Sequence, residues 1–505
     1  MGNISREGKG DGPHPRQEPR IPLPLTEENV RKVFRNAADF GERKALLGGN
    51  ENRPVTLFFI GGMVRGERVN DYLLRPLAQD RRLGEADAEE AYRLLKNGAL
   101  YNLYIKVCTD MDAAAGALVD GSCLLMFPGE RRALSFSTAT EEKRSVSEPE
   151  NESSAKGARD SFVESLRTNT SLVRRRLKAP ELCLSEHIVG RQSLTAVDVL
   201  WLEGIADPEL VKKIQARVDE IDIASLSGAG FLEQYVVDER HTAFPLTHFT
   251  ERPDRFSAGL AEGRVGILAD GMPVGWLLPA TVDQFLATEQ ELSGGWVTAG
   301  VLLVLRYLCL FVSLLLPGIY IAAVLFHPEM LPAPLMKSIV SAKRDVPFGT
   351  VFEVLMLLGA FELLQEAGRY LPAAIGQMAS ILGGLVVGSA AVEARIISPA
   401  VLVTVAVAGV AGFTTPSQDF AGALRLWRVG LAVLAAAGGL PAVTLGLLAL
   451  LLHLGRLETF DVPYLAPFAS SVGTEDGRYE VLRLPLPAAK LRLAYLRVKN
   501  RRNQR

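Results

Sequence analysis

The sequence has few cysteines and none of the common catalytic motifs. Its four cysteines, Cys108, Cys123, Cys183 and Cys309, stand in no CxxC spacing, so we expect reduced structural thiols rather than a zinc site or a disulfide framework. A phosphate-binding glycine loop, an HExxH helix and a GxSxG turn are all missing. The sequence therefore predicts neither an enzyme nor a bound cofactor or metal.

One group of acids and histidines comes nearest to a metal site: Asp238, Glu239, His241 and His248. Its spacing matches no common zinc site, and the prolines around it indicate a loop. We therefore expect no metal there.

The net charge is close to zero, and charged residues are scarce in one region. The net charge of -2 predicts no general affinity for nucleic acid. Residues 296–455 carry only 15 of the 112 charged residues, which excludes a purely soluble protein. The ordinary composition of the residues before them excludes a protein embedded wholly in a membrane. No apolar signal segment precedes that part, so we expect it to stay in the cytosol.

Composition also divides the chain. Residues 1–25 are rich in proline and charge and predict a disordered arm, while residues 138–160 are polar enough to predict a linker. A length of about 150 residues per domain gives roughly three units. The predicted units are α/β subdomains at 26–137 and 161–295, a helical membrane domain at 296–460, and a basic cytosolic tail at 461–505.

The two soluble units resemble each other. The run VTLFFIGG from Val55 aligns without gaps to VDVLWLEG from Val197, and an amphipathic helix follows each. Each unit also has an Asp-Gly pair between apolar runs, Asp120-Gly121 and Asp270-Gly271, as tight hairpin turns prefer. The sequence thus predicts a duplicated α/β module with strand, helix and hairpin, with chance likeness as the alternative.

A helix predicted over Phe162–Leu177 ends in three arginines, Arg174, Arg175 and Arg176. Cations suit a helix C-terminus, and such a cluster is usually a solvated face. Contact with anionic lipid or an acidic neighbouring subunit is the alternative.

Four uncharged stretches are long enough to cross a bilayer: Tyr307–Phe326, Tyr370–Val392, Ile396–Gln418 and Val429–Gly455. The basic tail from Lys490 predicts a cytosolic C-terminus. With a cytosolic N-terminus this requires an even number of crossings, and four fit. The loop with Lys337, Lys343 and Arg344 would then face outward, against the usual charge bias.

Residues 351–366 have a helical pattern but carry Glu353, Glu362 and Glu366. At 100° per residue, Glu362 and Glu366 share one face and Glu353 lies nearly opposite. We expect an interfacial helix with its glutamates in water, or a re-entrant or packed helix whose acids line an ion path.

Small residues recur in the apolar stretches, and small residues let membrane helices approach closely. Proline at Pro317 and Pro441 predicts kinks. The predicted helix-packing positions are Gly384, Gly388, Gly409 and Gly412.

With these features in place, the chain closely resembles the A subunits of spore germinant receptors, the GerA family, which includes the A-like protein encoded with the spore dipicolinic acid channel. The likeness covers about residues 160–470 strongly and 30–136 more loosely. The motifs that carry it are SLRTNTSLVRRRLKAPEL from Ser165, LEGIADPELV from Leu202, FTERPDR from Phe249, EGRVGILADGMP from Glu262, FHPEMLP from Phe326, ELLQEAGRYLP from Glu362, IGQMASILGGLVVG from Ile375 and VPYLAPFAS from Val462.

The resemblance implies a multi-pass protein of the spore inner membrane with a two-part cytosolic domain. It implies a homo-oligomer, a pentamer, that releases monovalent cations, together with a transporter-like B subunit and a lipoprotein C subunit. On this basis the candidate pore-lining residues are Glu362, Glu366, Gln377 and Ser380. Alternatives are an accessory ion-channel amplifier associated with dipicolinic acid release and a non-conducting scaffold. The Gly-rich stretch Ala287–Gly300 departs from the longer, charged stretch usual in the family.

Overall fold

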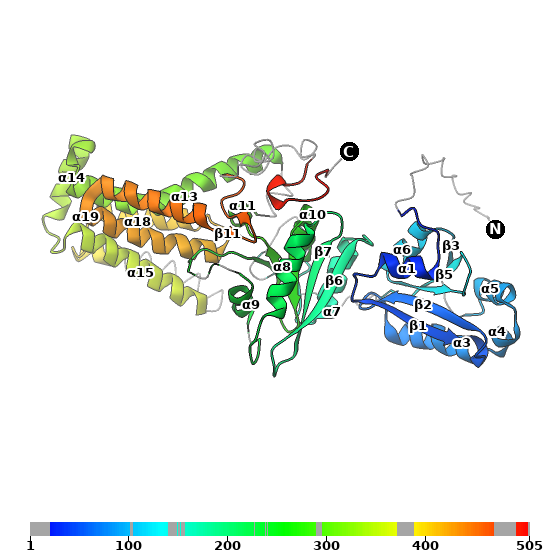
Figure 1. Cartoon of the computed structure of the whole chain (residues 1–505). Helices are drawn as coiled ribbons and strands as arrows, with labels where there is room; N and C mark the ends of the chain where they lie inside the picture. The colour runs from blue at the N-terminus through cyan, green and yellow to red at the C-terminus, as the bar shows by residue number, and fades with distance from the viewer. Residues whose placement is uncertain are drawn as a thin grey trace, which may run out of the picture.

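The computed structural model describes residues 21–100, 105–139, 149, 152, 157–226, 228–237, 239, 241–288, 295–370, 388–468 and 491–502 (Figure 1). Residues 1–20, most of the predicted linker, Asp238 and residues 371–387 lie outside these ranges. Two α/β subdomains and a helical domain follow one another along the molecule (Figure 1). Leu25, assigned to the arm by composition, is 2% exposed in the core of the first subdomain and therefore belongs to that subdomain.

The first subdomain is a five-stranded antiparallel sheet in the order β1-β2-β4-β5-β3. The strands are β1 Phe40–Leu46, β2 Pro54–Ile60, β3 Ile105–Cys108, β4 Ser122–Met126 and β5 Ala133–Ser137. The helices are α1 Glu27–Val33, α2 Gly66–Val69, η2 Asn70–Leu74, α3 Arg75–Gln79, α4 Arg81–Glu85, α5 Ala88–Lys96 and α6 Met111–Val119.

Helices cover both faces of this sheet because its strands are apolar on both sides. In β2, Val55 and Leu57 pack against α2–α5, whereas Phe58 and Ile60 pack against α1 and α6. Successive strand residues point to opposite faces, so a continuous apolar run such as VTLFFI indicates a strand buried between two helical layers.

The second subdomain repeats this arrangement with the strand order β6-β7-β9-β10-β8. Its strands are β6 Leu182–Val189, β7 Thr195–Leu202, β8 His248–Thr250, β9 Val265–Ala269 and β10 Gly275–Leu278. Its helices are α7 Leu166–Arg176, α8 Pro208–Asp219, α9 Ala229–Val236, α10 Pro253–Glu262 and α11 Val282–Leu286. The predicted α/β fold of two similar subdomains is confirmed.

The two Asp-Gly pairs, however, do not occupy equivalent turns, so the prediction of a hairpin at both is wrong for one of them. Asp270-Gly271 does form the β9–β10 turn, but Asp120-Gly121 joins helix α6 to strand β4. The counterpart of Gly121 is Gly263 between α10 and β9, and both glycines have positive φ (84° and 109°). A positive-φ glycine suits a helix end as well as a hairpin, so the dipeptide alone does not distinguish the two turns.

The subdomains are joined by a buried ion pair that corrects the prediction of a solvated arginine face. Arg174 of α7 and Asp39, just before β1, are each 1% exposed, and two guanidinium nitrogens each lie 2.5 Å from a carboxylate oxygen. The backbone of Ala38 also donates to the carbonyl of Leu184 on the edge strand β6, at 2.9 Å. Arg176 pairs with Asp160, which lies just before the second subdomain.

The helical domain contains α13 Trp296–Leu325, α14 Ala333–Lys343, α15 Thr350–Tyr370, α17 Gly388–Glu393, α18 Pro399–Gly412 and α19 Gln418–Arg456. Among the described helices, α13 and α19 are long and apolar enough to cross a membrane. The stretch predicted at Ile396–Gln418 forms a helix of only 14 residues. The count of four crossings remains a prediction.

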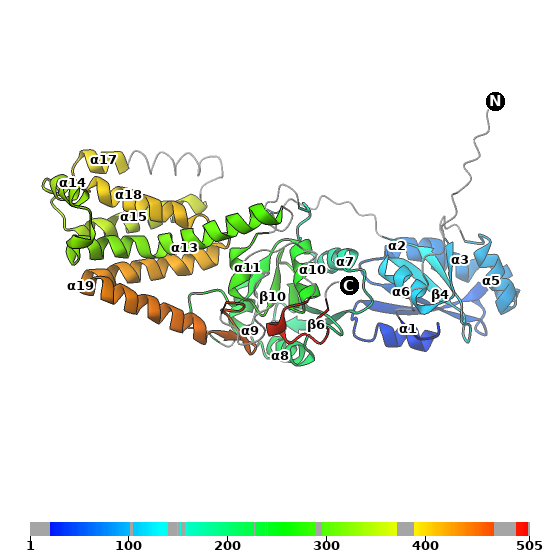
Figure 2. The ribbon, with the colours of Figure 1, turned by 90° about the horizontal axis from the view of Figure 1, so that it is seen from above.

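Helix α19 is a hairpin rather than the single span predicted at Val429–Gly455. Gly439 has φ 63° and ψ −147°, a conformation open essentially only to glycine, and Gly438 beside it is also non-helical. The first arm, residues 418–437, runs away from the second subdomain, and the second arm, residues 440–456, returns to it (Figure 2). A Cβ on Gly446 would lie 2.6 Å from the side chain of Leu431 in the other arm, which shows how closely the arms approach.

Small residues line contacts between other helices as well. A Cβ on Gly409 of α18 would lie 2.6 Å from the ring of Phe361 on α15, and one on Gly412 would lie 3.0 Å from Ser313 on α13. Gly388 lies near Leu402, while Gly384 is outside the described residues.

Candidate functional site

The second subdomain meets the helical domain through a cluster of aromatic side chains. Phe244, in the loop after α9, lies 5.6 Å between ring centroids from Phe420 at the start of α19 and 6.2 Å from His453 at its end. Phe285 of α11 stacks on Phe420 at 5.8 Å, and Tyr464 completes the cluster. Phe244 therefore contacts both arms of the hairpin at the ends that face the subdomain.

Polar contacts fix the same junction. The side chains of Thr242 and His453 are hydrogen-bonded at 3.0 Å. Arg306 of α13 donates to the carbonyl of Thr414 at 3.0 Å and to the carbonyl of Leu286, the last residue of α11. The subdomain is thus tied to the first and the last of the membrane-domain helices.

The C-terminal residues also return to the second subdomain. The backbone N–H of Val282 donates to the carbonyl of Tyr464 at 2.9 Å. Further on, Tyr495 lies 3.4 Å from the fully buried guanidinium of Arg264. The segments that precede and follow the helical domain in the sequence are therefore both bonded to the second subdomain.

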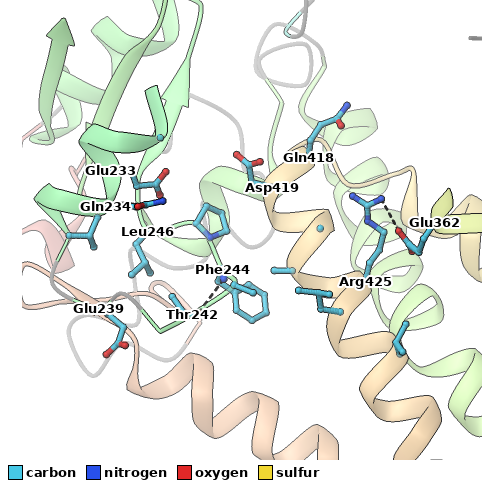
Figure 3. Close-up of a pocket in the computed structure, with 18 of the residues that line it drawn as sticks. Glu233, Gln234, Glu239, Thr242, Phe244, Leu246, Glu362, Gln418, Asp419 and Arg425 are labelled. Carbon is cyan, nitrogen blue, oxygen red and sulfur yellow. Dashed lines mark hydrogen bonds and ion pairs between the residues drawn. The ribbon is translucent and has the colours of Figure 1, made fainter. Parts of the chain in front are cut away.

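A cavity of about 950 Å³ lies beside this junction, between α9 with its following loop and helices α15 and α19 (Figure 3). Its walls include apolar side chains such as Phe244 and Leu246, and among the described residues more acidic than basic groups line it. The charged residues that line it are Glu233, Glu239, Glu362, Glu366, Asp419 and Arg425.

Two of the four predicted pore-lining residues, Glu362 and Glu366, line this cavity. The carboxylate of Glu362 lies 3.2 Å from Arg425 and 2.6 Å from the buried Arg428, both on the first arm of α19. The sequence did not pair these arginines with Glu362. The signal was available, because Arg425 and Arg428 are among the few charges of the apolar region. Gln377 and Ser380 lie outside the described residues.

Glu233 faces the cavity from the α/β side. Burial raises the pKa of Glu233, although the backbone N–H of Thr247, at 3.3 Å from its carboxylate, favours the charged form. Among the residues that the structure describes, no three acidic, histidine or cysteine side chains gather to hold a metal ion. His248 of the earlier metal candidate is buried in β8, and burial lowers the pKa of its imidazole well below the usual value.

Glu353 lies at the other end of α15. The hypothesis of an interfacial helix placed this glutamate in water, but the structure buries it. Its side chain is fully buried and accepts a hydrogen bond at 2.8 Å from the backbone N–H of Ser398, the residue before α18. Lys343 of α14 lies 3.6 Å away. A carboxylate at a helix N-terminus stabilises that end of the helix.

Comparison with known proteins gives consistent matches. Residues 28–495 match the profile of the family described as Bacillus/Clostridium GerA spore germination protein. The chain is 34% identical to spore germination protein KA of Bacillus subtilis, covering 92% of this chain and 86% of that protein. It is 30% identical to spore germination protein GerLA of Bacillus cereus, covering 94% and 95%. A crystal structure of the N-terminal domain of the A subunit of the Bacillus megaterium spore germinant receptor GerK3 is 29% identical, with a TM-score of 0.40, over 51% of this chain and 97% of that one.

Proposed function

Because this chain belongs to the GerA family of spore germination proteins, we propose that it is the A subunit of a spore germinant receptor that oligomerises in the spore inner membrane and releases monovalent cations when germination starts. In this proposal a nutrient bound by a partner shifts the A oligomer from a closed to an open state. The protein acts without catalysis or cofactor.

The observation that carries the proposal is the junction itself. One α/β unit contacts α13 and both arms of α19 through Phe244 and its helix α11, next to a cavity whose described lining has an excess of acidic side chains. Movement of that unit would therefore change the relative positions of the helices that hold Glu362 and Arg425. An acidic wall beside the helices favours cations over anions.

The topology in the membrane belongs to the proposal as well. Helix α13 begins at the second subdomain and α19 ends there (Figure 2). We therefore infer an even number of crossings, with the N-terminal domain and the C-terminus on one side of the membrane. We place that side in the cytosol. Large apolar side chains of α13, α18 and α19 are exposed on the single chain, as expected for contact with lipid or with neighbouring copies.

The assembly is proposed from the family resemblance. We expect a homo-oligomer, a pentamer, in contact with a transporter-like B subunit, a lipoprotein C subunit and membrane lipid. Glu362 and Glu366 are the proposed pore-lining residues within the described part of the chain, with Gln377 and Ser380 further along.

The test measures potassium release from dormant spores that carry the wild-type gene, Glu366→Gln, Glu362→Gln or the control Glu329→Gln. Glu329 is exposed at the distal end of the helical domain. Spores that carry Glu329→Gln should therefore release potassium normally. Glu366→Gln should slow release at normal protein level, because an acidic group near the ion path is lost. Normal release by both glutamine variants with normal assembly would remove these residues from the ion path.

The same assay separates the receptor from its alternatives. Deletion of the gene should abolish potassium release in response to one class of nutrient. Slower release in response to every nutrient would make the protein an accessory amplifier instead. Unchanged release with altered receptor clustering would make it a scaffold.

A further inference from the structure

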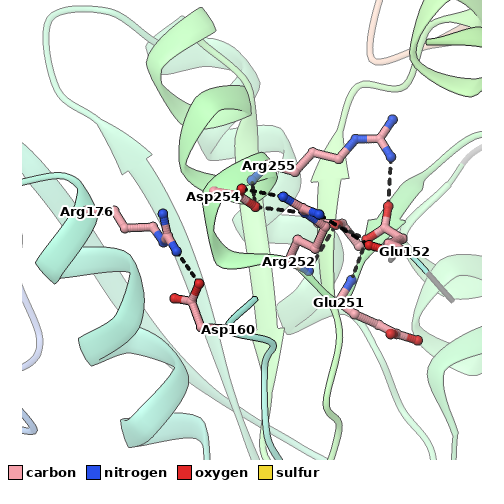
Figure 4. Close-up of polar contacts among 8 residues, drawn as sticks. Glu152, Asp160, Arg176, Glu251, Arg252, Asp254 and Arg255 are labelled. Atoms are coloured by element: carbon pink, nitrogen blue, oxygen red, sulfur yellow. Dashed lines mark hydrogen bonds and ion pairs between the residues drawn. The ribbon is translucent and has the colours of Figure 1, made fainter. Parts of the chain in front are cut away.

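The second subdomain holds a carboxylate in a set of donors where β8 leads into α10. The carboxylate belongs to Glu152, which lies between the two subdomains in the sequence, about a hundred residues before the donors. Glu251, Arg252 and Arg255 lie around Glu152 (Figure 4), and the hydroxyl of Thr250 donates to its carboxylate. All four residues around Glu152 lie in the motif FTERPDR, to which the cation-release proposal gives no role.

Each oxygen of the Glu152 carboxylate has its own donors. Oε2 accepts from the hydroxyl of Thr250 at 2.5 Å and from the backbone N–H of Glu251 at 3.0 Å. Oε1 accepts from the guanidinium of Arg255 at 2.7 Å. Arg252 donates to the backbone carbonyl of Glu152 at 3.2 Å. A hydroxyl, a backbone N–H and a guanidinium converging on two oxygens are the donor set that recognises a carboxylate.

The donors are held in place by contacts that do not involve Glu152. Thr250 is fully buried, and its hydroxyl oxygen accepts from the backbone N–H of Arg252 at 3.1 Å. Arg252 is 2% exposed and is paired with both oxygens of Asp254, at 3.0 and 2.6 Å. Burial alone would raise the pKa of Asp254, but Arg252 and the N–H of Arg255 outweigh it and lower the pKa. The site is therefore preorganised for an anion.

We propose that Thr250, the N–H of Glu251 and Arg255 form a carboxylate-binding site, that Glu152 is its resident occupant, and that a free carboxylate takes the same place when Glu152 is absent. The ligand class is a carboxylate small enough for one pair of oxygens to reach the three donors. This site is separate from the proposed ion path, so the two proposals stand or fall independently.

Arg255 links the site to the membrane domain. While one terminal nitrogen of its guanidinium donates to Glu152, the other donates to the carbonyls of Gln284 at 2.7 Å and Ala287 at 3.3 Å. Both carbonyls lie at the end of α11, which precedes α13 in the sequence. Among the described residues, loss of the carboxylate would leave the guanidinium of Arg255 bonded to these two carbonyls alone. Occupancy of the site therefore bears on the segment that leads into α13.

The test is chemical rescue in the full-length protein in detergent, with thermal unfolding followed by tryptophan fluorescence. Glu152→Ala should lower the Tm by roughly 2–4 °C, and sodium acetate raised to about 100 mM should restore it progressively. Arg255→Ala should also lower the Tm, but acetate should not restore it, because the main donor is lost. Sodium chloride at the same ionic strength is the control for screening.

Three results would overturn the proposal. They are an unchanged Tm of Glu152→Ala in acetate, equal restoration by chloride, and equal restoration of Arg255→Ala. Glu152→Gln serves as a second variant should the alanine variant fail to fold, since it keeps the side-chain shape but loses the charge and replaces one accepting oxygen by a donating NH2 group. Acetate must raise its Tm as well, by displacing the neutral amide, and no rise would count against the site.

Discussion

The buried pair of Arg174 and Asp39 gives the sharpest prediction about stability. Replacing Arg174 by Met removes the guanidinium and leaves the Asp39 carboxylate buried at 1% exposure between the subdomains. Removing one partner of a buried pair costs about 3–5 kcal/mol, because the remaining charge is uncompensated. At about 2–4 °C per kcal/mol for a unit of this size, Arg174→Met should lower the Tm of the α/β domain by roughly 6–20 °C.

A matched control and a double variant isolate the cause. Arg191 and Asp222 form a similar two-bond pair, at 2.6 and 2.7 Å, but both side chains are about 70% exposed. Arg191→Met should therefore cost less than about 1 kcal/mol. The double variant Arg174→Met with Asp39→Leu removes both charges together and should recover most of the lost stability.

The assay is thermal unfolding of the full-length protein in detergent, with each single variant and the double variant compared in a cycle. Losses that simply add in the double variant would refute the reasoning, because they would show that the two side chains act independently. So would an equal Tm change for Arg174→Met and Arg191→Met.

Three further predictions concern other sites. Gly439→Ala should destabilise the helical domain by about 1–3 kcal/mol, because its φ of 63° is strained for alanine and a Cβ would lie 3.0 Å from Phe326. Thermal unfolding and protein yield check this prediction. An equal effect of Gly430→Ala, where a Cβ meets nothing within 4 Å, would contradict it. Burial raises the pKa of Asp198 to about 7, so the native state binds a proton that the unfolded state releases above about pH 4. Stability should therefore fall as the pH rises from about 4 to about 7, and Asp198→Asn should flatten that part of a Tm-against-pH curve; parallel curves would be inconsistent with this origin. Burial also raises the pKa of Cys123 and Cys183 to about 12, so iodoacetamide at pH 8 should modify them only after denaturation, as mass spectrometry of labelled peptides would show. Labelling of the folded protein at the rate of free cysteine would count against burial.

The junction explains how an α/β domain could act on membrane helices. Phe244 contacts both arms of α19, and Arg306 ties α11 to α13 and α18. A shift of the second subdomain would thus reach several helices at once. Arg255 of the proposed carboxylate site donates to the carbonyl of Gln284 in α11, which precedes α13, so this site would act on the same segment independently of the junction.

The sequence by itself determined the class of fold. The runs at Val55 and Val197 are largely apolar on both faces, as suits a strand between two helical layers, and they form the matching strands β2 and β7. The small number of charged residues after residue 296 likewise predicted a helical domain there. These signals are local, because each depends on side chains within one element.

The candidate site was only partly predictable. The face shared by Glu362 and Glu366 follows from helical periodicity, and both residues do line the cavity. Their partners Arg425 and Arg428 come from a helix about sixty residues later, and Phe244 comes from a loop in another domain. Periodicity within one helix carries no information about which distant element packs on it.

Tertiary structure decided the remaining features for the same reason. Arg174 is one of three consecutive arginines, and only the arrangement of the two subdomains buries it against Asp39 while Arg176 pairs elsewhere. Gly438 and Gly439 could stand within one long helix, but packing of the two arms stabilises the chain reversal there. Composition and periodicity determine which elements form, whereas burial of charge and reversal of the chain depend on contacts between elements far apart in sequence.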